Sequence, residues 1–424
     1  MRKMVLWGLF LSISLVTMAQ QTQVDTTELD QIALDEVLVS AVRVTREAPV
    51  TFSNLKKDRI AKRNLGQDIP ILMNYLPSVV TTSDAGAGIG YTGIRVRGSD
   101  ATRVNVTING IPYNDAESQG TFWVNMPDFA SSTESLQLQR GVGTSTNGAG
   151  AFGASLNILT DVVSSEAYAE LTASAGSFNT HRATAKFSTG LLGDQFEFSG
   201  RLSRIASDGY IDRAASDLDS YFLQGAFVKE KTLLKALMFG GHEVTYQSWY
   251  GFDPDVLGAI GVDNNLESNR RYNIAGIQFD RDGNFEGFYD NQVDDYKQDH
   301  FQLHWNQEWT EAFQTNIALH YTRGRGFFEE YVDEWYYTNV LFAPDAQLSF
   351  LGLDNPVIDG EEISTMDYAR RRWLDNDFYG TVFSGTYRQG PLEVLLGGGW
   401  NTYRGDHFGE VIWARYAGDL EPRN

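Results

Sequence analysis

The sequence predicts a mixed α/β domain followed by long antiparallel β-strands of the kind that close into a membrane-spanning barrel. Two observations lead to this class. Aromatic residues make up 13% of the 424 residues, and 41 glycines stand against 10 prolines, which is typical of a β-rich chain with many turns. Helical periodicity occurs only before residue 161, and alternation of apolar and polar residues dominates after it.

The composition excludes several classes of protein. A formal net charge of −21 leaves no basic surface for a nucleic-acid backbone, so no nucleic-acid partner is expected. Without cysteine, the chain has no disulfide scaffold, thiol nucleophile or cysteine-ligated zinc. With 42% apolar residues, the chain can bury a sizeable core, which argues against disorder.

The N-terminus has the three regions of a secretory signal peptide. Two basic residues precede an apolar run from Met4 to Val16, and Ala19 ends a small-residue cleavage pattern. We therefore predict a signal peptide over residues 1–19. The polar, acidic stretch that follows predicts a flexible arm over residues 20–47.

The arm contains an apolar segment from Leu34 to Arg43. A tethered segment of this kind binds by adding a strand to another protein's sheet. The alternative, which the pattern supports at least equally, is a first strand of the next domain.

Residues 48–160 have the pattern of a small α/β domain, with nine basic and eight acidic residues. A short amphipathic helix is expected from Ile69 to Leu76. Ile94–Gly98 and Val104–Ile108 alternate as half-buried strands do, and Asn109-Gly110 predicts a hairpin turn.

Gly88-Ile-Gly90-Tyr-Thr-Gly93 matches the letters of a dinucleotide-binding motif. That motif needs a buried strand before it and a helix after it, whereas here a polar segment precedes and a strand follows. We expect a mobile loop instead. Glycines also recur between Gln139 and Thr160, where we expect close backbone approach or rearrangement.

Residues 161–424 contain strands longer than the usual five or six residues. From Phe301 to Trp309 and from Phe313 to Tyr321, one face is apolar and the other polar, as in an outer-membrane barrel. A secreted β-sandwich is the alternative. About ten strands are expected, centred near Tyr168, Ala183, Phe198, Leu223, Ala236, Leu303, Leu319, Phe383, Leu396 and Val411.

Two long connections carry most of the acidity. Glu243 to Gln298 holds 11 acidic and 4 basic residues, and Arg323 to Asp377 holds 12 and 5. Together they account for 14 of the 21 excess negative charges. Short turns on one side and long loops on the other are the outer-membrane pattern, in which the long loops face outward.

No catalytic or metal-binding constellation stands out. His300 and His304 have the i, i+4 spacing of a helical metal pair, but on a strand they lie about 13 Å apart. No nucleophile elbow is present in the sequence. We therefore predict no enzyme, no catalytic residue, no metal site and no cofactor.

Four blocks of the sequence resemble the TonB-dependent outer-membrane receptors. Gly93–Gly98, Arg103–Pro112 and Leu138–Ile158 are similar to the plug-domain blocks of that family and stand in its order. The residues that resemble its TonB box, and that the resemblance implies bind TonB, are Asp35, Glu36, Val37, Leu38, Val39 and Ser40.

The resemblance implies a plug inside a barrel of about 22 strands in the outer membrane of a Gram-negative bacterium, with the arm in the periplasm. It implies uptake of a scarce ligand, with lipid around the barrel and energy supplied through TonB and its inner-membrane complex. Because few residues precede the box, a ferric siderophore or ferric citrate chelate is expected, with cobalamin or an oligosaccharide as alternatives. Outside the family, the alternatives are a secreted carbohydrate-binding protein or hydrolase, and a porin or adhesin.

Geometry predicts that the chain holds only part of a barrel. A plug of residues 48–160 has a diameter of roughly 34 Å, whereas ten strands close to only about 20 Å across. About 22 strands reach roughly 44 Å. We therefore expect residues 161–424 to be the incomplete N-terminal part of a barrel, with about 10 of 22 strands.

The ligand contacts are expected on two plug loops, Ser83 to Tyr91 and Tyr113 to Trp123. Polar groups there would hydrogen-bond a chelate, and aromatic rings would cover it. Packing against the barrel wall is the alternative for each residue. The acidic outer loops would repel an anionic chelate such as citrate, within the ~8 Å reach that salt allows. The named ligand contacts are Tyr91, Gln119, Phe122 and Trp123.

Overall fold

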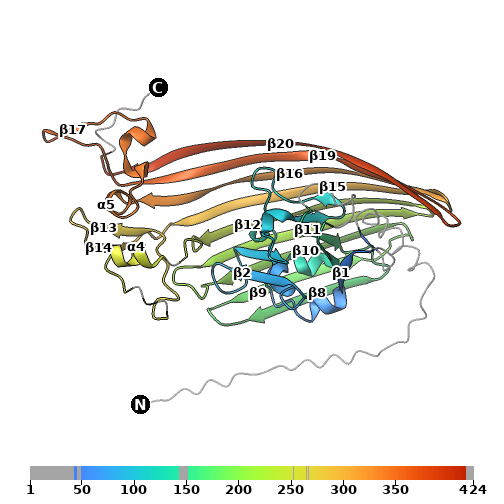
Figure 1. Ribbon diagram of the computed structural model, residues 1–424. Coiled ribbons are helices and arrows are strands. Elements are labelled where there is room, and N and C mark those ends of the chain that lie inside the picture. The colour runs from blue at the N-terminus through green and yellow to red at the C-terminus, as the bar shows by residue number, and fades with distance from the viewer. Residues whose placement is uncertain are drawn as a thin grey trace, which may run out of the picture.

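The computed structural model shows a small domain held against the concave side of a broad sheet of long strands (Figure 1). The small domain, coloured blue to teal, is called the plug domain here, and the sheet, coloured green to red, is called the strand wall. The predicted signal peptide and the six box residues lie outside the described residues. The structure describes residues 43–44, 49–142, 151–251, 253–263, 265 and 267–416.

The plug domain is built on a five-stranded sheet and a separate hairpin. Its elements are β1 (Thr51–Lys56), α2 (Lys57–Ala61), α3 (Ile69–Leu72), β2 (Val79–Ser83), β3 (Thr92–Val96), η1 (Ala101–Arg103), β4 (Val104–Ile108), β5 (Ile111–Pro112), η2 (Trp123–Asn125), η3 (Phe129–Ser132), β6 (Thr133–Arg140) and β7 (Ala154–Thr160). The sheet order is β1-β6-β7-β4-β5, and β2 pairs with β3. Of the ladders in the sheet, only β4 with β7 is parallel. Among the described residues, β1 lies at the edge of this sheet and pairs only with β6.

Local sequence explains the tightest turns of the plug domain. Asn109 and Gly110 join β4 to β5 with φ of 53° and 80°, so the predicted hairpin turn is confirmed. Helix α3 carries Pro70 in its first turn but is shorter than predicted, because the chain leaves the helix at Met73 to reach β2. None of the helices in the described ranges has the length and apolarity to cross a bilayer.

The core of the plug domain continues into the strand wall. Strands β4, β6 and β7 supply fully buried side chains such as Ile108, Leu136 and Leu156. The same cluster includes Phe222 and Phe239, which project inward from the wall. The inner face of the wall is thus partly apolar where it meets the plug domain, so packing there excludes water.

The strand wall is a nine-stranded antiparallel sheet in which neighbours in sequence are neighbours in space. Its strands are β8 (Ala167–Ala175), β9 (His181–Thr189), β10 (Phe196–Ser207), β11 (Ser216–Lys229), β12 (Thr232–Tyr246), β15 (Val293–Thr310), β16 (Phe313–Val332), β19 (Tyr368–Gln389) and β20 (Leu392–Ala414). This agrees with about ten expected strands. The two segments expected near Leu396 and Val411 lie on one strand, β20, because its charged middle stays paired with β19.

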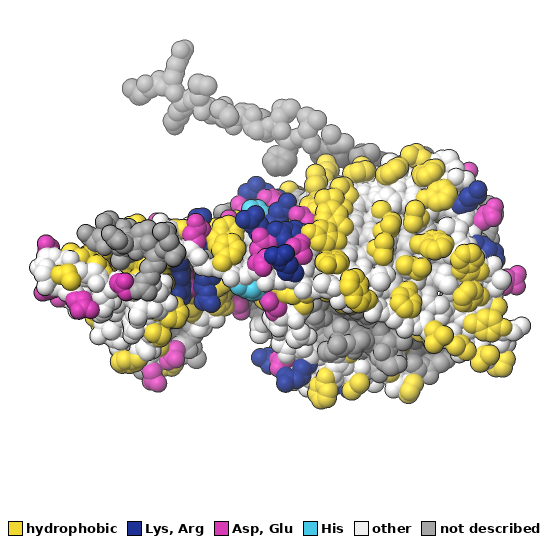
Figure 2. Space-filling view, turned by 90° about the horizontal axis from the view of Figure 1, so that it is seen from above, with side chains coloured by type: hydrophobic (Ala, Val, Ile, Leu, Met, Phe, Trp, Pro, Cys, Tyr) yellow, Lys and Arg dark blue, Asp and Glu magenta, His cyan; other side chains and the backbone are white. Residues whose placement is uncertain are grey.

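The outward face of the strand wall has an apolar band and a charged border. Exposed side chains such as Leu303, Leu319 and Trp400 form the band. Toward the long-loop ends, ion pairs such as Arg323 with Asp377 (2.9 Å) border it. Figure 2 shows both the apolar side chains and the clustered charges beside them. The band matches a surface that faces lipid, and the charges mark its outer limit.

The two long loops are shorter than predicted. They span residues 247–292 and 333–367, because β12, β15, β16 and β19 continue as paired polar strands beyond the apolar band. Each loop is folded on itself rather than extended. Their elements are α4 (Pro254–Ala259), β13 (Ile277–Phe279), β14 (Phe285–Phe288), α5 (Glu334–Asn339), η5 (Pro344–Ala346), η6 (Leu348–Leu351), β17 (Val357–Ile358) and β18 (Glu361–Glu362).

Candidate functional site

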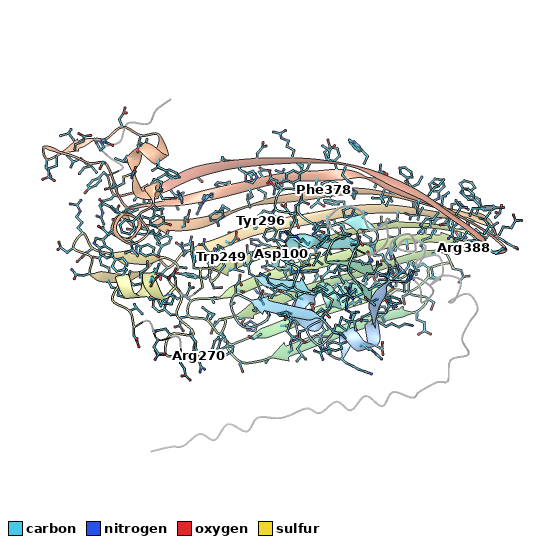
Figure 3. All side chains as sticks on the ribbon, in the orientation of Figure 1. Asp100, Trp249, Arg270, Tyr296, Phe378 and Arg388 are labelled. Atoms are coloured by element: carbon cyan, nitrogen blue, oxygen red, sulfur yellow. The ribbon has the colours of Figure 1, made fainter. Side chains whose placement is uncertain are left out.

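A cavity of about 240 Å³ lies between the plug domain and the inner face of the strand wall. The plug domain contributes Tyr91 and the loop that follows β5, and the wall contributes side chains from β12, β15, β16, β19 and β20. Figure 3 shows two of the wall residues, Tyr296 and Phe378, beside the plug domain. Larger hollows of about 860, 780 and 740 Å³ contain no plug side chain. In the 240 Å³ cavity, in contrast, a ligand would touch both the plug domain and the strand wall of the described chain.

The cavity is acidic and aromatic. No lysine or arginine is among the described residues that line it. Its carboxylates are Asp115, Glu117, Glu243 and Asp294. Its aromatic rings, apart from two histidines, are Tyr91, Tyr113, Phe122, Tyr296, Phe378 and Tyr403.

Tyr91 joins the plug domain to two of these carboxylates. Its hydroxyl donates a hydrogen bond to Asp294 and is also within hydrogen-bonding reach of Glu243. Its ring packs edge-on against Trp249, with centroids 5.1 Å apart. Burial raises the pKa of Tyr91, and the two carboxylates raise it further, so the hydroxyl stays protonated and acts as a donor.

The other end of the cavity is closed by the loop after β5. The Glu117 carboxylate accepts from the Tyr403 hydroxyl at 3.1 Å and lies 2.7 Å from Nε2 of His407. The Asp115 carboxylate accepts from the backbone N–H of Ser118 at 2.7 Å, which shapes the loop. These contacts link the plug loop to β20, the last strand of the wall.

Of the four predicted ligand contacts, two line the cavity and two do not. Tyr91 and Phe122 are lining residues. The Gln119 side chain instead donates to the carbonyl of Ala116 at 2.7 Å. Trp123 is 2% exposed and packs in the plug core, because η2 turns its ring inward. We therefore leave Gln119 and Trp123 out of the proposed contacts.

Sequence analysis did not single out the wall residues of the cavity. Glu243 and Asp294 were counted only as part of an acidic loop, although both lie on strands with their side chains at the cavity. The sequence feature that could identify them is an acidic residue at a position of an alternating strand whose side chain points inward. Reading that signal requires the strand register, which the sequence alone does not supply.

His300 and His304 both lie on the inner face of β15, and their contacts are separate. His300 hydrogen-bonds Thr322 at 2.9 Å, and His304 hydrogen-bonds Gln302 at 3.0 Å. Within the described ranges, no three histidine or carboxylate side chains are placed so that they could hold a metal ion.

A buried ion-pair cluster outside the cavity ties the plug domain to the wall. Asp128 is within 3.2 Å of Arg182 and 3.5 Å of Arg201, and all three side chains are at most 4% exposed. The carboxylate also accepts from the hydroxyls of Thr184 and Ser203, each at 2.7 Å. Burial alone would raise the pKa of Asp128, but Arg201 and Arg182 hold it below its usual value.

A second buried carboxylate lies where the plug domain leads into the wall. Asp161 follows β7 and pairs with Lys186 of the wall at 2.5 Å and with Lys57 of the plug domain at 2.8 Å. Burial opposes its charge, but the two lysines keep the pKa of Asp161 below its usual value. Both carboxylates are thus ionised and clamp the plug domain in place.

The end of the arm is docked on the plug sheet. The N–H of Val44 donates to the Gln137 side chain at 2.8 Å, and the Gln137 amide donates back to the carbonyl of Val44 at 3.0 Å. Arg43 donates to the Ser135 hydroxyl at 2.8 Å. Arg43 also donates to the carbonyl of Asn157 at 3.0 Å, so the described arm residues, which follow the predicted box closely, touch both β6 and β7 of the plug sheet.

Comparisons with known proteins agree with this architecture. The profile of the TonB-dependent Receptor Plug Domain family matches residues 44–155. A search of curated proteins finds no match. The solved structure of the Pseudomonas aeruginosa receptor FpvA with a heterologous pyoverdine and iron has a TM-score of 0.58 at 14% identity, over 90% of this chain and 46% of that chain.

Two further solved structures have the same fold. The copper transporter OprC has a TM-score of 0.59 at 12% identity, over 87% of this chain and 48% of that one. The unliganded ferric citrate transporter FecA has a TM-score of 0.59 at 12% identity, over 88% and 51%. The chain therefore spans about half the length of these structures. Residues 44–155 thus match a TonB-dependent receptor plug domain, and the chain as a whole has the fold of about half of these structures, a plug domain held against an antiparallel strand wall.

Proposed function

We propose that this chain acts in the energised import of a scarce metal chelate, a ferric siderophore above all, across the outer membrane. The observation that carries the proposal is the cavity, which is lined by plug and wall residues together. A ligand bound there contacts Tyr91 and Phe122 of the plug domain as well as the wall. Movement of the plug domain would therefore change the ligand site directly. We assign no catalytic residue to the chain.

The identity of the cargo follows from the cavity and from the fold. The FpvA structure is a complex with a pyoverdine and iron, and FecA is a ferric citrate transporter. The cavity favours the siderophore class over citrate, because four carboxylates without a lysine or arginine among the described lining residues repel a polyanion. Aromatic rings and hydroxyls suit the large, partly apolar surface of a siderophore.

We further propose that TonB binds Asp35 to Ser40 by strand addition from the periplasm and pulls on the plug domain through the arm. The pull would reach the plug sheet at Val44 and Gln137, whose two hydrogen bonds join the arm to β6. Strand β1 follows next in the chain and is an edge strand. Removing one edge strand costs much less than unfolding the domain, so sequential release of β1 would come first.

The test replaces Val37 by proline in the box. Proline removes a backbone donor and cannot join a sheet in the middle of a strand, so strand addition should fail. We expect Val37→Pro to abolish uptake of a labelled ferric siderophore in iron-limited cells while binding to whole cells is unchanged. A matched control is Thr27→Pro, which adds a proline to the same arm outside the box. Normal uptake by Val37→Pro, or loss of binding as well, would contradict the proposal.

A further inference from the structure

The acidic side of the cavity has no lysine or arginine among the lining residues that the structure describes. Glu243 and Asp294 both approach the single hydroxyl of Tyr91, which can give only one hydrogen bond at a time. No ion pair joins either carboxylate to a lysine or arginine of the described chain. Glu243 has one further donor, the hydroxyl of Thr245 at 3.2 Å. Two carboxyl groups that share one donor, with no lysine or arginine partner among the described residues, leave acceptor capacity for a further donor such as a protonated amine.

The cavity also holds buried acceptors that lack a donor. Asn125 of the plug domain is 7% exposed and is one of the residues that line the cavity, and its buried side-chain oxygen has no hydrogen-bond partner among the described residues. Asn376 of strand β19 also lines the cavity, and its buried side-chain oxygen is likewise without a partner among the described residues. Buried polar atoms are normally paired, so two free acceptors on opposite walls indicate a ligand that brings N–H donors.

The aromatic lining suits the same chemistry. The rings of Tyr113, Tyr296 and Phe378 line a cavity that has no lysine or arginine among its described lining residues. Tyrosine and phenylalanine faces attract an ammonium or guanidinium group, and they do so more strongly when water is excluded. Carboxylates, amide oxygens and ring faces are thus the three partners that a protonated amine requires.

The volume limits how much of a ligand enters. About 240 Å³ is smaller than the ~300–1,000 Å³ of a site that encloses a drug-sized ligand. It is enough for a flexible side arm of several heavy atoms. A bare metal ion is not the occupant that these residues suit, because no group of three ligating side chains is placed to hold one in the described chain.

We propose that the cavity receives a protonated amine arm of the chelate, held by Glu243 and Asp294 and by the amide oxygens of Asn125 and Asn376, and that it thereby selects cationic over anionic chelates. The inference rests on the proposed import function and specifies its substrate class. The metal centre of the chelate stays outside the cavity, on the side of the long loops.

The test compares two chelates that differ in one charge. Ferrioxamine B carries a terminal ammonium on an alkyl arm, and its N-acetyl derivative has the same iron centre and a neutral arm. Binding to the receptor in outer-membrane vesicles is measured by tryptophan fluorescence, with ferric citrate as the anionic probe. We expect ferrioxamine B to bind at least about tenfold more tightly than the acetylated chelate, which one charge-assisted hydrogen bond can supply.

Amide variants locate the selectivity in the cavity. Glu243→Gln with Asp294→Asn keeps the side-chain volumes and should bring the ratio of the two affinities near one. Asp290→Asn is the matched control, because Asp290 is exposed in the first long loop and does not line the cavity. The control removes a nearby negative charge and should leave the ratio unchanged.

Other results would overturn the inference. Equal binding of the two chelates by the native receptor, tighter binding of ferric citrate, or no binding of either chelate would each do so. Persistence of the preference in the double amide variant would also overturn it. The import function is tested separately by Val37→Pro. If the cells take up a different chelate and Val37→Pro abolishes that uptake, the proposed function stands even though the inference about the amine arm fails.

Discussion

Replacing Asp128 by alanine should loosen the plug domain from the strand wall. The substitution leaves Arg182 and Arg201 buried, at 4% and 1% exposure, without their counter-charge. It also removes the acceptor for the hydroxyls of Thr184 and Ser203. Removal of one partner from a buried ion pair costs about 3–5 kcal/mol. We therefore expect a loss of about 4 kcal/mol, which is roughly a thousandfold in the equilibrium for plug docking.

The loss should be independent of pH around neutrality. Because the folded-state pKa of Asp128 is below its unfolded value, its stabilisation is present above about pH 4 and is lost only at lower pH. Hydrogen exchange of the plug domain in detergent, at pH 6 and pH 8, measures the docking free energy. Asp58→Ala is a control, because Asp58 is exposed on α2. A change below about 1 kcal/mol for Asp128→Ala at both pH values would refute this reasoning.

Three further substitutions test other contacts. Burial raises the pKa of Asp68 to about 8, so the cost of ionising its buried carboxyl grows between about pH 4 and pH 8. Asp68→Asn removes this cost and should flatten the pH dependence of the free energy of plug unfolding by up to about 1.4 kcal/mol per pH unit. Gln137→Ala removes both hydrogen bonds to Val44 and should slow uptake without changing chelate binding. A Cβ at Gly241 would lie 2.6 Å from Cδ of Pro127. Gly241→Ala should therefore lower the free energy of plug docking by about 1–3 kcal/mol, which faster hydrogen exchange of the plug domain would report.

Each of these has its own control or contrary outcome. An unchanged pH profile in Asp68→Asn would contradict the assignment of the slope to Asp68. Gln137→Ala would contradict the force path if uptake stayed normal. Gly225→Ala is the matched control for Gly241→Ala, because its Cβ would meet Phe198 at an ordinary 3.5 Å. Equal effects of the two alanines would argue against close plug contact at Gly241.

Local patterns predicted the elements whose geometry depends on neighbouring residues. Asn109 and Gly110 form the predicted turn because both residues tolerate the positive φ that it requires. The turn also contacts the wall, where the Asn109 side chain donates to Gln302 at 3.1 Å. Alternation predicted the strands of the wall, since side chains on one strand must alternate between lipid and interior. Alternation did not predict that two expected strands form the single strand β20. Backbone pairing with β19 continues through charged residues, where the apolar and polar alternation is interrupted.

The candidate site was only half predictable. Tyr91 and Phe122 lie on loops whose glycines and polar residues indicated exposure toward a ligand. Trp123 has the same composition around it, but its ring turned into the core. Which of two adjacent aromatic residues faces a cavity depends on the path of a single turn, and no periodic signal records that path.

The sequence by itself determined the division into plug domain and strand wall, the lipid-facing band and the acidity of the outer loops, because each follows from composition and period along the chain. Only the tertiary structure decided which charges meet. It brought Glu243, Asp294 and Tyr91 together without a cation, and it placed Asp128 between Arg182 and Arg201. Electrostatic energy depends on distance and burial, and residues far apart in the chain acquire both only when the plug domain docks against the wall.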